Sequence, residues 1–393
     1  MRLGRFFLGA AGGFAAGYVA WRAFEAARTI RSEQAVMHPD AASYGRTRRA
    51  LAVGGVLRAM ASTVAFAYGP AGERLEQITK PVPVWLRPAV FTGVASLASA
   101  AVEFPTSLVE GYALERRYGL SEQPLNAWSA DYVKSTLIET AVGALLATLA
   151  GAVVRRAPRA WPWIASLGTL PLLVLANVIV PIYIMPLFNK FEPLDGPLEV
   201  RLRNLASRFG VGDADILRMD MSRQTKKANA FVTGIGSTHR IVLGDTLIEH
   251  FEPEEIEFVV AHELGHYVAK DTWRMIATAE ALAVLLLFTS QRVTRLERDA
   301  NDAEMQLARI YAVMIMGSQA LRPLLMAFSR SREWAADRFA IDATRDPASG
   351  AAAFRRLRDQ NLAEDEVPAW YEFFFSSHPS LKARIEALEA TGA

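Results

Sequence analysis

Seven apolar stretches of this chain are candidates to cross a lipid bilayer as helices. A spanning helix needs about 20 mostly apolar residues, and 51% of the 393 residues are hydrophobic whereas 21% are charged. The stretches cover residues 6–24, 51–68, 84–104, 132–154, 161–187, 275–290 and 307–328. Their number and length predict a mainly α, polytopic membrane protein with about seven transmembrane helices.

The first stretch has an alternative interpretation. It follows Met1 with Arg2 and Arg5 close behind, which is also the form of a cleavable signal peptide. The apolar run continues to Phe24 without a small-residue cleavage site, and glycine and alanine are common in membrane helices. A retained anchor is therefore favoured.

Charged residues also lie within these stretches, among them Arg58, Arg87, Glu103 and Glu139. Charged side chains inside membrane helices usually face the interior of a helix bundle or a watery cavity. We expect this for Arg58, Glu103 and Glu139, although Glu103 is close enough to the end of its stretch to reach the interface.

A motif with two histidines lies in the polar segment between the fifth and sixth stretches. His262 and His266 are four residues apart, and Glu263 directly follows the first. On a helix both imidazoles lie on one face and can bind one ion, and catalytic zinc commonly takes three protein ligands and a water. Pro253 suits the first position of such a helix. The alternative is a chance match, which the total of six histidines disfavours.

A second charged segment can supply the third ligand. Residues 329–338 have helical spacing, with Glu333 and Asp337 four residues apart. One carboxylate can bind zinc while the other accepts the distal ring N–H of a liganding histidine. Three arginines interleave with these acids. Without the histidine motif, the segment could equally be the solvated, charged end of a helix.

The order of the stretches predicts that both parts of this site lie on one side of the membrane. Two crossings separate the histidine motif from Glu333. The arginine-rich loop over residues 25–50 falls on the same side, and the positive-inside rule then makes that side cytoplasmic. Arg155, Arg156 and Arg159, between the fourth and fifth stretches, favour the opposite orientation.

The polar segment that contains the histidine motif predicts a compact α/β insert. Residues 198–209 have helical spacing, and residues 229–234 and 240–244 resemble two strands around a glycine-rich turn. A strand beside a zinc helix can pair with an extended peptide, although an ordinary structural hairpin has the same pattern. We divide the chain into spans 1–5 (1–187), the insert (188–274), spans 6–7 (275–328) and a C-terminal catalytic segment (329–393).

Composition excludes several other chemistries. The chain has no cysteine, which excludes disulfides and thiolate ligands. Its net charge of +2 is spread over the loops, with no basic aromatic stripe to indicate nucleic-acid binding.

An ordered set of motifs resembles one protein family. The motifs lie at residues 115–121, 186–194, 227–234, 262–266, 333–337 and 377–385. Together they resemble the integral-membrane zinc metallopeptidases of family M48 that include the Ste24-type CaaX prenyl proteases. The resemblance covers nearly the whole chain. It implies a zincin-like catalytic insert and seven spans that enclose a water-filled chamber, with the active site at its cytoplasmic side.

The resemblance implies roles for the residues around the metal. His262, His266 and Glu333 would bind one zinc ion per chain. Glu263 would take a proton from the zinc-bound water as that water attacks a peptide carbonyl. Asp337 would hold a liganding histidine in place.

The resemblance also implies roles for residues farther from the metal. His378 would lie near the cleft and donate to the oxyanion, and Arg384 would tie the tail segment to the site. Asn229 would lie on the substrate-facing edge strand, which continues through Ala230 and Phe231.

We therefore expect a membrane-embedded zinc endopeptidase that cleaves membrane-associated or CaaX-like polypeptides, lipidated or not. The alanine- and arginine-rich composition indicates a bacterial inner membrane. One alternative is an HtpX-like quality-control protease, although the five stretches before residue 190 favour the Ste24 type. Another is a site-2-type intramembrane protease with Asp195 as ligand, but Asp195 precedes the histidines in a polar segment. A non-enzymatic carrier or scaffold would leave the ligand set unexplained.

Overall fold

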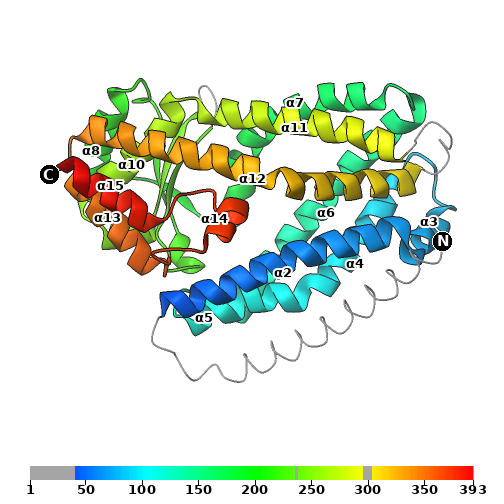
Figure 1. The fold of residues 1–393 in the computed structure, drawn as a ribbon, viewed down its shortest axis with the longest axis horizontal. Helices are drawn as coiled ribbons and strands as arrows, with labels where there is room; N and C mark the ends of the chain where they lie inside the picture. Colours follow the sequence, from blue (N-terminus) through cyan, green and yellow to red (C-terminus); the bar gives the residue numbers. More distant parts are fainter. Residues whose placement is uncertain (1–39, 235–237, 295–302, 393) are drawn as a thin grey trace.

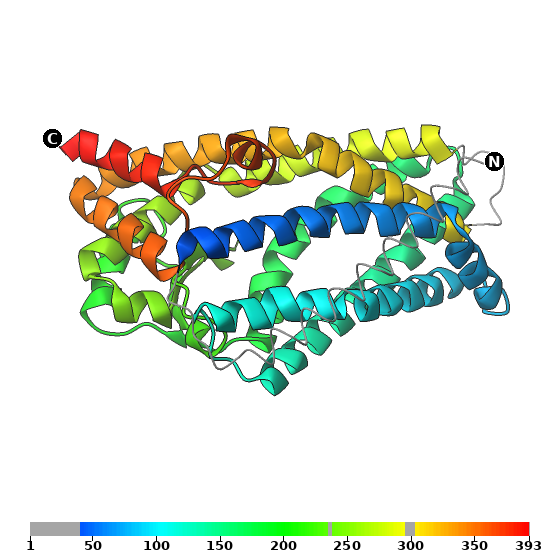
Figure 2. The ribbon, with the colours of Figure 1, turned by 60° about the horizontal axis from the view of Figure 1, so that its bottom comes forward.

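The molecule combines a bundle of long helices with a compact α/β part at one end of it (Figures 1 and 2). The computed structural model describes residues 40–234, 238–294 and 303–392. Six helices within these ranges are long and apolar enough to cross a membrane, and they match the second to seventh predicted stretches. The first predicted stretch, residues 6–24, lies outside the described residues, so a seventh span stays a prediction.

Two of the six spans contain irregular turns. A short helix follows the first of the six spans. The spans comprise α2 (Ala41–Tyr68), α4 with η1 and α5 (Arg87–Leu108, Val109–Ala113, Leu114–Arg117), α6 (Leu125–Arg156), α7 with η2 and η3 (Trp161–Ile179, Val180–Ile184, Met185–Leu187), α11 (Asp271–Thr294) and α12 (Ala303–Thr344). The short helix is α3 (Pro70–Thr79). Most helices extend beyond the apolar stretch that predicted them.

The start of α2 corrects one prediction. Residues 41–50 belong to this helix and not to the loop predicted over residues 25–50. Asp40 caps the helix, since its Oδ1 accepts a hydrogen bond from the Ala42 amide at 3.0 Å. Alanine and arginine dominate the first turns and are strong helix formers, so the helix continues outside the apolar stretch.

Two of the three charges expected to face the bundle interior or a watery cavity pair with each other. Arg58 Nε of α2 lies 2.8 and 2.7 Å from the two carboxylate oxygens of Glu103 on α4. The pair is partly buried, so removal of one member would leave the other charge poorly compensated. This contact therefore ties α2 to α4 inside the bundle.

The α/β part is built on a four-stranded sheet in the order β1-β2-β4-β3. Its strands are β1 (Phe191–Pro193), β2 (Asp215–Met219), β3 (Ala230–Thr233) and β4 (Arg240–Gly244). The two predicted strands, β3 and β4, pair antiparallel with Phe231 opposite Val242. The prediction missed β1, which has three residues, and β2, whose mixed sequence lacks regular alternation. Strand β3 lies at the edge of the sheet, as predicted.

Helices around this sheet form the main hydrophobic core. They are α8 (Pro197–Ser207), α9 (Asp245–His250), α10 (Pro253–Val268), α13 (Pro347–Gln360) and α15 (Leu381–Gly392). The predicted apolar stripe of α10 is buried in this core through Ile256, Val259, Val260 and Leu264. Burial of this stripe holds the histidine helix against the sheet.

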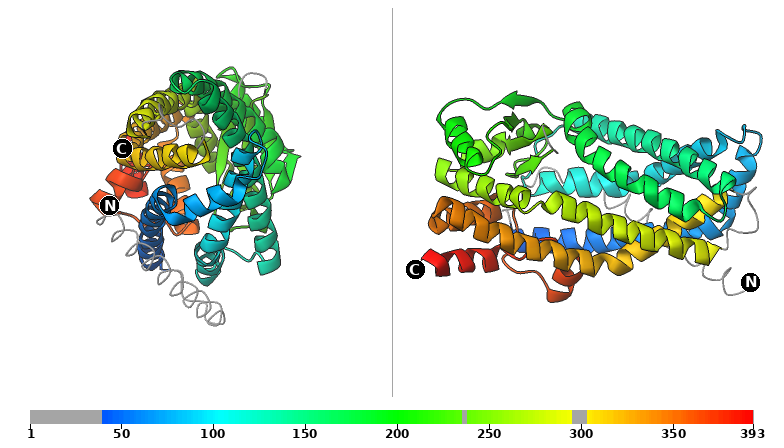
Figure 3. Two further views of the ribbon diagram at one scale, coloured as in Figure 1. Left: turned by 90° about the vertical axis from the view of Figure 1, so that its right-hand side faces the viewer. Right: turned by 90° about the horizontal axis from the view of Figure 1, so that it is seen from above.

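Helix α12 links the two parts of the molecule. It runs without a break from the bundle into the α/β part (Figures 1 and 3). Residues 329–338, predicted as a second helical stretch, are the continuation of this helix. Its 42 residues correspond to about 63 Å, roughly twice the thickness of the hydrocarbon core. A short helix, α14 (Ala369–Phe375), lies beside α12 and precedes α15.

A cluster of polar side chains joins the start of the edge strand to the helix bundle. Lys227, three residues before β3, lies 2.7 Å from Glu115 Oε2 and donates to the Tyr44 hydroxyl at 2.8 Å. Tyr44 in turn donates to Glu115 Oε1 at 2.5 Å. From the other side, Asn361 bonds both the amide and the carbonyl of Ala228, at 2.8 and 3.2 Å. The segment that leads into β3 is thus held by both halves of the chain.

Candidate metal centre

Helix α10 presents the two histidines of the motif on one face. It begins where predicted, with Pro253 at its first position, and a capping box fixes this end. The Glu252 side chain accepts from the Glu255 amide, and the Glu255 carboxylate accepts from the Glu252 amide at 2.9 Å. Two turns later His262 and His266 lie with their ring centroids 4.9 Å apart.

The glycine of the motif lets α12 approach this face closely. A Cβ atom on Gly265 would lie 3.1 Å from the Ala336 Cα and 3.2 Å from the Phe339 Cβ. A larger residue at this position would therefore push the two helices apart. Because Glu333 is one helical turn before Ala336, the close approach brings its carboxylate beside the two imidazoles.

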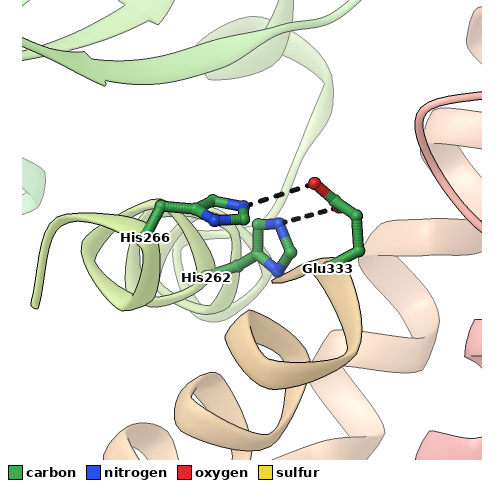
Figure 4. Close-up of side chains that lie close together, drawn as sticks. All are labelled: His262, His266 and Glu333. Atoms are coloured by element: carbon green, nitrogen blue, oxygen red, sulfur yellow. Dashed lines mark ion pairs between the residues drawn. The ribbon is translucent and has the colours of Figure 1, made fainter. Parts of the chain in front are cut away.

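The predicted ligand atoms meet in one place (Figure 4). His262 Nε2 lies 3.4 Å from Glu333 Oε2, and His266 Nε2 lies 3.4 Å from Glu333 Oε1. Within the described ranges, His262, His266 and Glu333 form the group of acidic and histidine side chains that can hold a metal ion. The topological prediction that both segments emerge on the same side is confirmed by this contact.

Each histidine is held by a carboxylate on its other ring nitrogen. Asp337 Oδ1 lies 2.9 Å from His262 Nδ1, which is the contact predicted for this residue. Asp271 Oδ2 lies 2.9 Å from His266 Nδ1. Both contacts fix the ring orientation and leave both Nε2 atoms directed toward Glu333.

Sequence reasoning missed the role of Asp271. This residue is nearly fully buried at the start of α11, and Arg332 Nε donates to its Oδ1 at 2.7 Å. The chain reaches it through Lys270, whose positive φ of 56° ends α10 in a tight turn. The signal available in the sequence was an aspartate five residues after His266, next to the predicted end of the helix.

Arg384 ties the C-terminal helix to the site, as the resemblance implied. Its Nε and Nη2 donate to the two oxygens of Asp337 at 2.8 and 2.6 Å, and its Nη1 lies 3.5 Å from Glu333 Oε2. The guanidinium also stacks over the Phe354 ring, with its carbon 4.1 Å from the ring centroid. This planar fork orients the carboxylate that in turn orients His262.

His378 lies at the open side of the same site. Its Nε2 is 3.4 Å from Glu333 Oε1, and its Nδ1 lies 2.8 Å from the Ser377 hydroxyl. The imidazole is 61% exposed, whereas the side chains of His262 and Glu333 are almost fully buried. It is therefore placed where a molecule that approaches from solvent would meet it.

The arrangement fits a zinc ion. Two donor atoms that share a tetrahedral zinc at about 2.0–2.1 Å lie about 3.3 Å apart, close to the 3.4 Å measured from each histidine to Glu333. Glu333 Oε2 is buried and makes no hydrogen bond within the described residues. Arg384 Nη1 lies 3.5 Å from this oxygen and supplies positive charge without a hydrogen bond, and a metal ion bound by the two histidines would satisfy the oxygen directly.

Glu263 directly follows the first histidine and is partly buried. Burial raises the pKa of its carboxyl above the ordinary value, while the neighbouring His262 and His266 act in the opposite direction. A raised pKa brings a carboxylate closer to the operating pH, which suits proton transfer.

The predicted substrate-facing residues lie on a strand next to the histidine helix and not among the ligands. Strand β3 packs against α10, and the carbonyl of Asn229 accepts the Gly244 amide at 2.9 Å. An open cavity of about 460 Å³ lies beside this strand, with Phe231 and Thr233 on one side and Val180 of η2 on the other. The strand thus contacts the histidine helix and borders a cavity that it shares with η2.

We expect Asp271→Asn to weaken metal binding by about 10–100-fold. The amide keeps the shape of the side chain but cannot balance the charge of the His266–metal unit or the Arg332 guanidinium. Competition with a chelator during metal analysis of the purified protein measures this change. Asp342→Asn, an exposed position on α12, is the matched control, and equal affinities in both variants would contradict the role of Asp271.

Two family models together match almost the whole chain. The model of the CAAX prenyl protease N-terminal region, with five membrane helices, matches residues 31–190. The model of peptidase family M48 matches residues 194–392, which contain every ligand described above.

Relatives and a solved structure agree with these matches. CAAX prenyl protease 1 of Saccharomyces cerevisiae is 30% identical over 323 residues, covering 76% of this chain and 71% of its own. The uncharacterized metalloprotease YhfN of Bacillus subtilis is 29% identical over 333 residues, covering 79% and 78%. The crystal structure of S. mikatae Ste24p shares the fold, with a TM-score of 0.74 at 23% identity over 97% and 98% of the two chains. The chain therefore belongs to peptidase family M48 and is a metalloprotease of the Ste24 type.

Proposed function

We propose that this protein is a membrane-embedded zinc endopeptidase that hydrolyses peptide bonds in membrane-associated polypeptides. The observation that carries the proposal is the convergence of His262, His266 and Glu333, with both imidazoles oriented by carboxylates. Two nitrogens and one carboxylate oxygen are a donor set of catalytic zinc. When bound, zinc acts as a Lewis acid and lowers the pKa of a coordinated water to about 7.

Glu263 is the proposed general base. Its place directly after a ligand and its partial burial keep it beside the metal without making it a ligand. It removes a proton from the attacking water and returns it to the leaving amine. His378, whose Nε2 lies on the open side of Glu333, donates a hydrogen bond to the developing oxyanion.

Substrate binding is proposed to occur along the outer edge of β3, the last strand in the order of the described sheet. An extended peptide can add to this edge through backbone hydrogen bonds, which tolerates many sequences. Asn229 is exposed at the start of the strand, and Ala230 and Phe231 continue it. Phe231 also lines the neighbouring cavity, which can accept an apolar group of the substrate.

Membrane-associated polypeptides, including CaaX-like ones, are the proposed substrates because Glu333 is on α12, which continues from a membrane span into the α/β part. A relative bears the name CAAX prenyl protease 1, which makes lipidated peptides candidates. The match of the five-helix model favours this class over an HtpX-like quality-control protease. The arginines among residues 25–50, which topology places on the same side as the site, support a cytoplasmic active site, and the alanine- and arginine-rich composition supports a bacterial inner membrane.

Peptide cleavage by the detergent-purified protein tests this function. An unmodified quenched-fluorescent peptide and the same peptide with a prenylated C-terminal cysteine are compared, each with and without a zinc chelator. We expect chelator-sensitive cleavage of the unmodified peptide that returns on addition of zinc. Cleavage of the prenylated peptide alone would restrict the substrate class, and cleavage of neither would refute the proposal.

A further inference from the structure

The short helix α14 carries an exposed aromatic face that the metal centre does not use. Five of its seven residues, Ala369–Phe375, are aromatic. Trp370, Phe373 and Phe374 are 53%, 51% and 43% exposed. Their spacing of three and four residues places them on one side of the helix. A contiguous exposed apolar face of this kind marks an interaction surface.

The opposite face of α14 is fixed to two of the spanning helices. Tyr371 and Phe375 stack with their ring centroids 5.0 Å apart. The Arg49 guanidinium of α2 lies 5.9 Å from the Tyr371 ring centroid, and that of Arg322 on α12 lies 4.6 Å from the Phe375 ring centroid. The position of α14 along the bundle is therefore defined by its contacts.

The end of α14 is also held by α12. Arg330 donates to the carbonyl oxygens of Glu372 and Ser376, both at 2.8 Å. These carbonyls belong to the last turn of the helix and the residue after it. Arg330 thus satisfies backbone acceptors that would otherwise need water.

These contacts place α14 at the membrane boundary that the sequence predicts for both helices. Arg49 is two residues before the start of the second apolar stretch at residue 51. Arg330 is two residues beyond the end of the seventh stretch at residue 328, and Arg322 is six residues before that end. Six helical residues correspond to about 9 Å, which is the depth at which interfacial helices bury their apolar face.

The surroundings of α14 agree with this location. The helix lies on the outer side of α12 (Figure 3, right) and crosses toward α2 (Figure 1). Its one charged residue, Glu372, faces Arg330 at 4.0 Å. The segment before the helix contains exposed Asp365 and Glu366, and two serines follow it. An aromatic helix between two polar segments is typical of a chain that dips into a membrane surface.

We propose that α14 is a membrane-interface helix that inserts Trp370, Phe373 and Phe374 into the lipid headgroup region at the catalytic end of the bundle. The bilayer is the partner that its chemistry fits, because the exposed face has large aromatic rings and no charge. The helix ends three residues before His378. Lipid contact at α14 therefore holds the tail segment that carries this histidine. The inference goes beyond the proposed function and does not depend on which polypeptides are cleaved.

Single-cysteine spin labelling tests this inference, and the chain suits it because it has no native cysteine. Phe373→Cys and Phe374→Cys are each labelled with a nitroxide and reconstituted into phosphatidylethanolamine–phosphatidylglycerol vesicles. Leu145→Cys, an exposed apolar position on α6, is the lipid control, and Glu386→Cys, exposed on α15, is the water control. Relaxation by oxygen and by a water-soluble nickel chelate reports the surroundings of each label.

We expect the ratio of oxygen relaxation to nickel-chelate relaxation at both α14 labels to exceed that at Glu386 and to stay below that at Leu145, because the headgroup region admits both reagents. Relaxation mainly by the nickel chelate, as at Glu386, would overturn the proposal because the face would then be in water. Protection from both reagents would also overturn it, since protein would then cover the face. Using two positions keeps the test decisive if one variant fails to fold.

Discussion

Glu263→Gln is expected to leave the metal bound and to lower kcat by about 10³-fold or more. Glutamine occupies the same space as glutamate but cannot accept the proton of the attacking water, and general-base catalysis typically contributes about 10²–10⁴-fold. Glu263 is outside the group of three ligand side chains, so its substitution leaves the donor set intact. The measurement is the cleavage rate of a quenched-fluorescent peptide, with metal content determined on the same sample.

Glu254→Gln is the matched control for this experiment. It lies on the exposed first turn of the same helix, where it pairs with Arg201. The change is chemically identical, so a general effect on α10 would appear in both variants. Normal turnover in Glu263→Gln at full metal content would show that another group activates the water.

Glu333→Gln is expected to abolish metal binding and activity together. An amide oxygen is a much weaker zinc ligand than a carboxylate. The substitution also removes the negative charge that faces two histidines and Arg384 at 3.4–3.5 Å. The expected metal content falls from one ion per chain to near zero, as measured by elemental analysis after purification without added zinc.

A graded comparison separates ligand loss from loss of folding. Asp337→Asn keeps all three ligands but removes the charge that His262 and Arg384 share, so we expect reduced affinity that excess zinc restores. Glu386→Gln, exposed on α15, is expected to behave as wild type. If Glu333→Gln retained a full complement of metal, the third ligand would have to be a different residue.

The sequence predicts the metal centre better than it predicts the α/β part around it. The spacing of His262 and His266 works because a helix has a fixed periodicity, and the cap at Pro253 marks where that helix begins. Glu333 could be paired with the motif because two predicted crossings separate them. These inferences use local rules and one topological count.

The features that sequence reasoning missed depend on tertiary contact. Strands β1 and β2 are short or irregular and are stabilised by pairing with each other and with β4. Asp271 reaches His266 because the tight turn at Lys270 directs the chain back toward it. The contact between Lys227 and Glu115 joins two motifs that are 112 positions apart (227 − 115) in the sequence. No local pattern indicates that such residues meet.

Because α12 continues from the membrane to Glu333, forces that the bilayer exerts on this helix can reach the metal centre. This helix belongs to the membrane spans over one part of its length and holds Glu333 on another, with Pro323 between the two ends. A tilt of the membrane segment would strain the close contact between α12 and α10 at Gly265, beside which the carboxylate meets the histidines. Bilayer thickness and lateral pressure would then influence the distances between the Glu333 carboxylate and the two imidazoles. Cleavage of α12 at the membrane surface would therefore separate Glu333 from the membrane segment that helps to position it beside the two histidines.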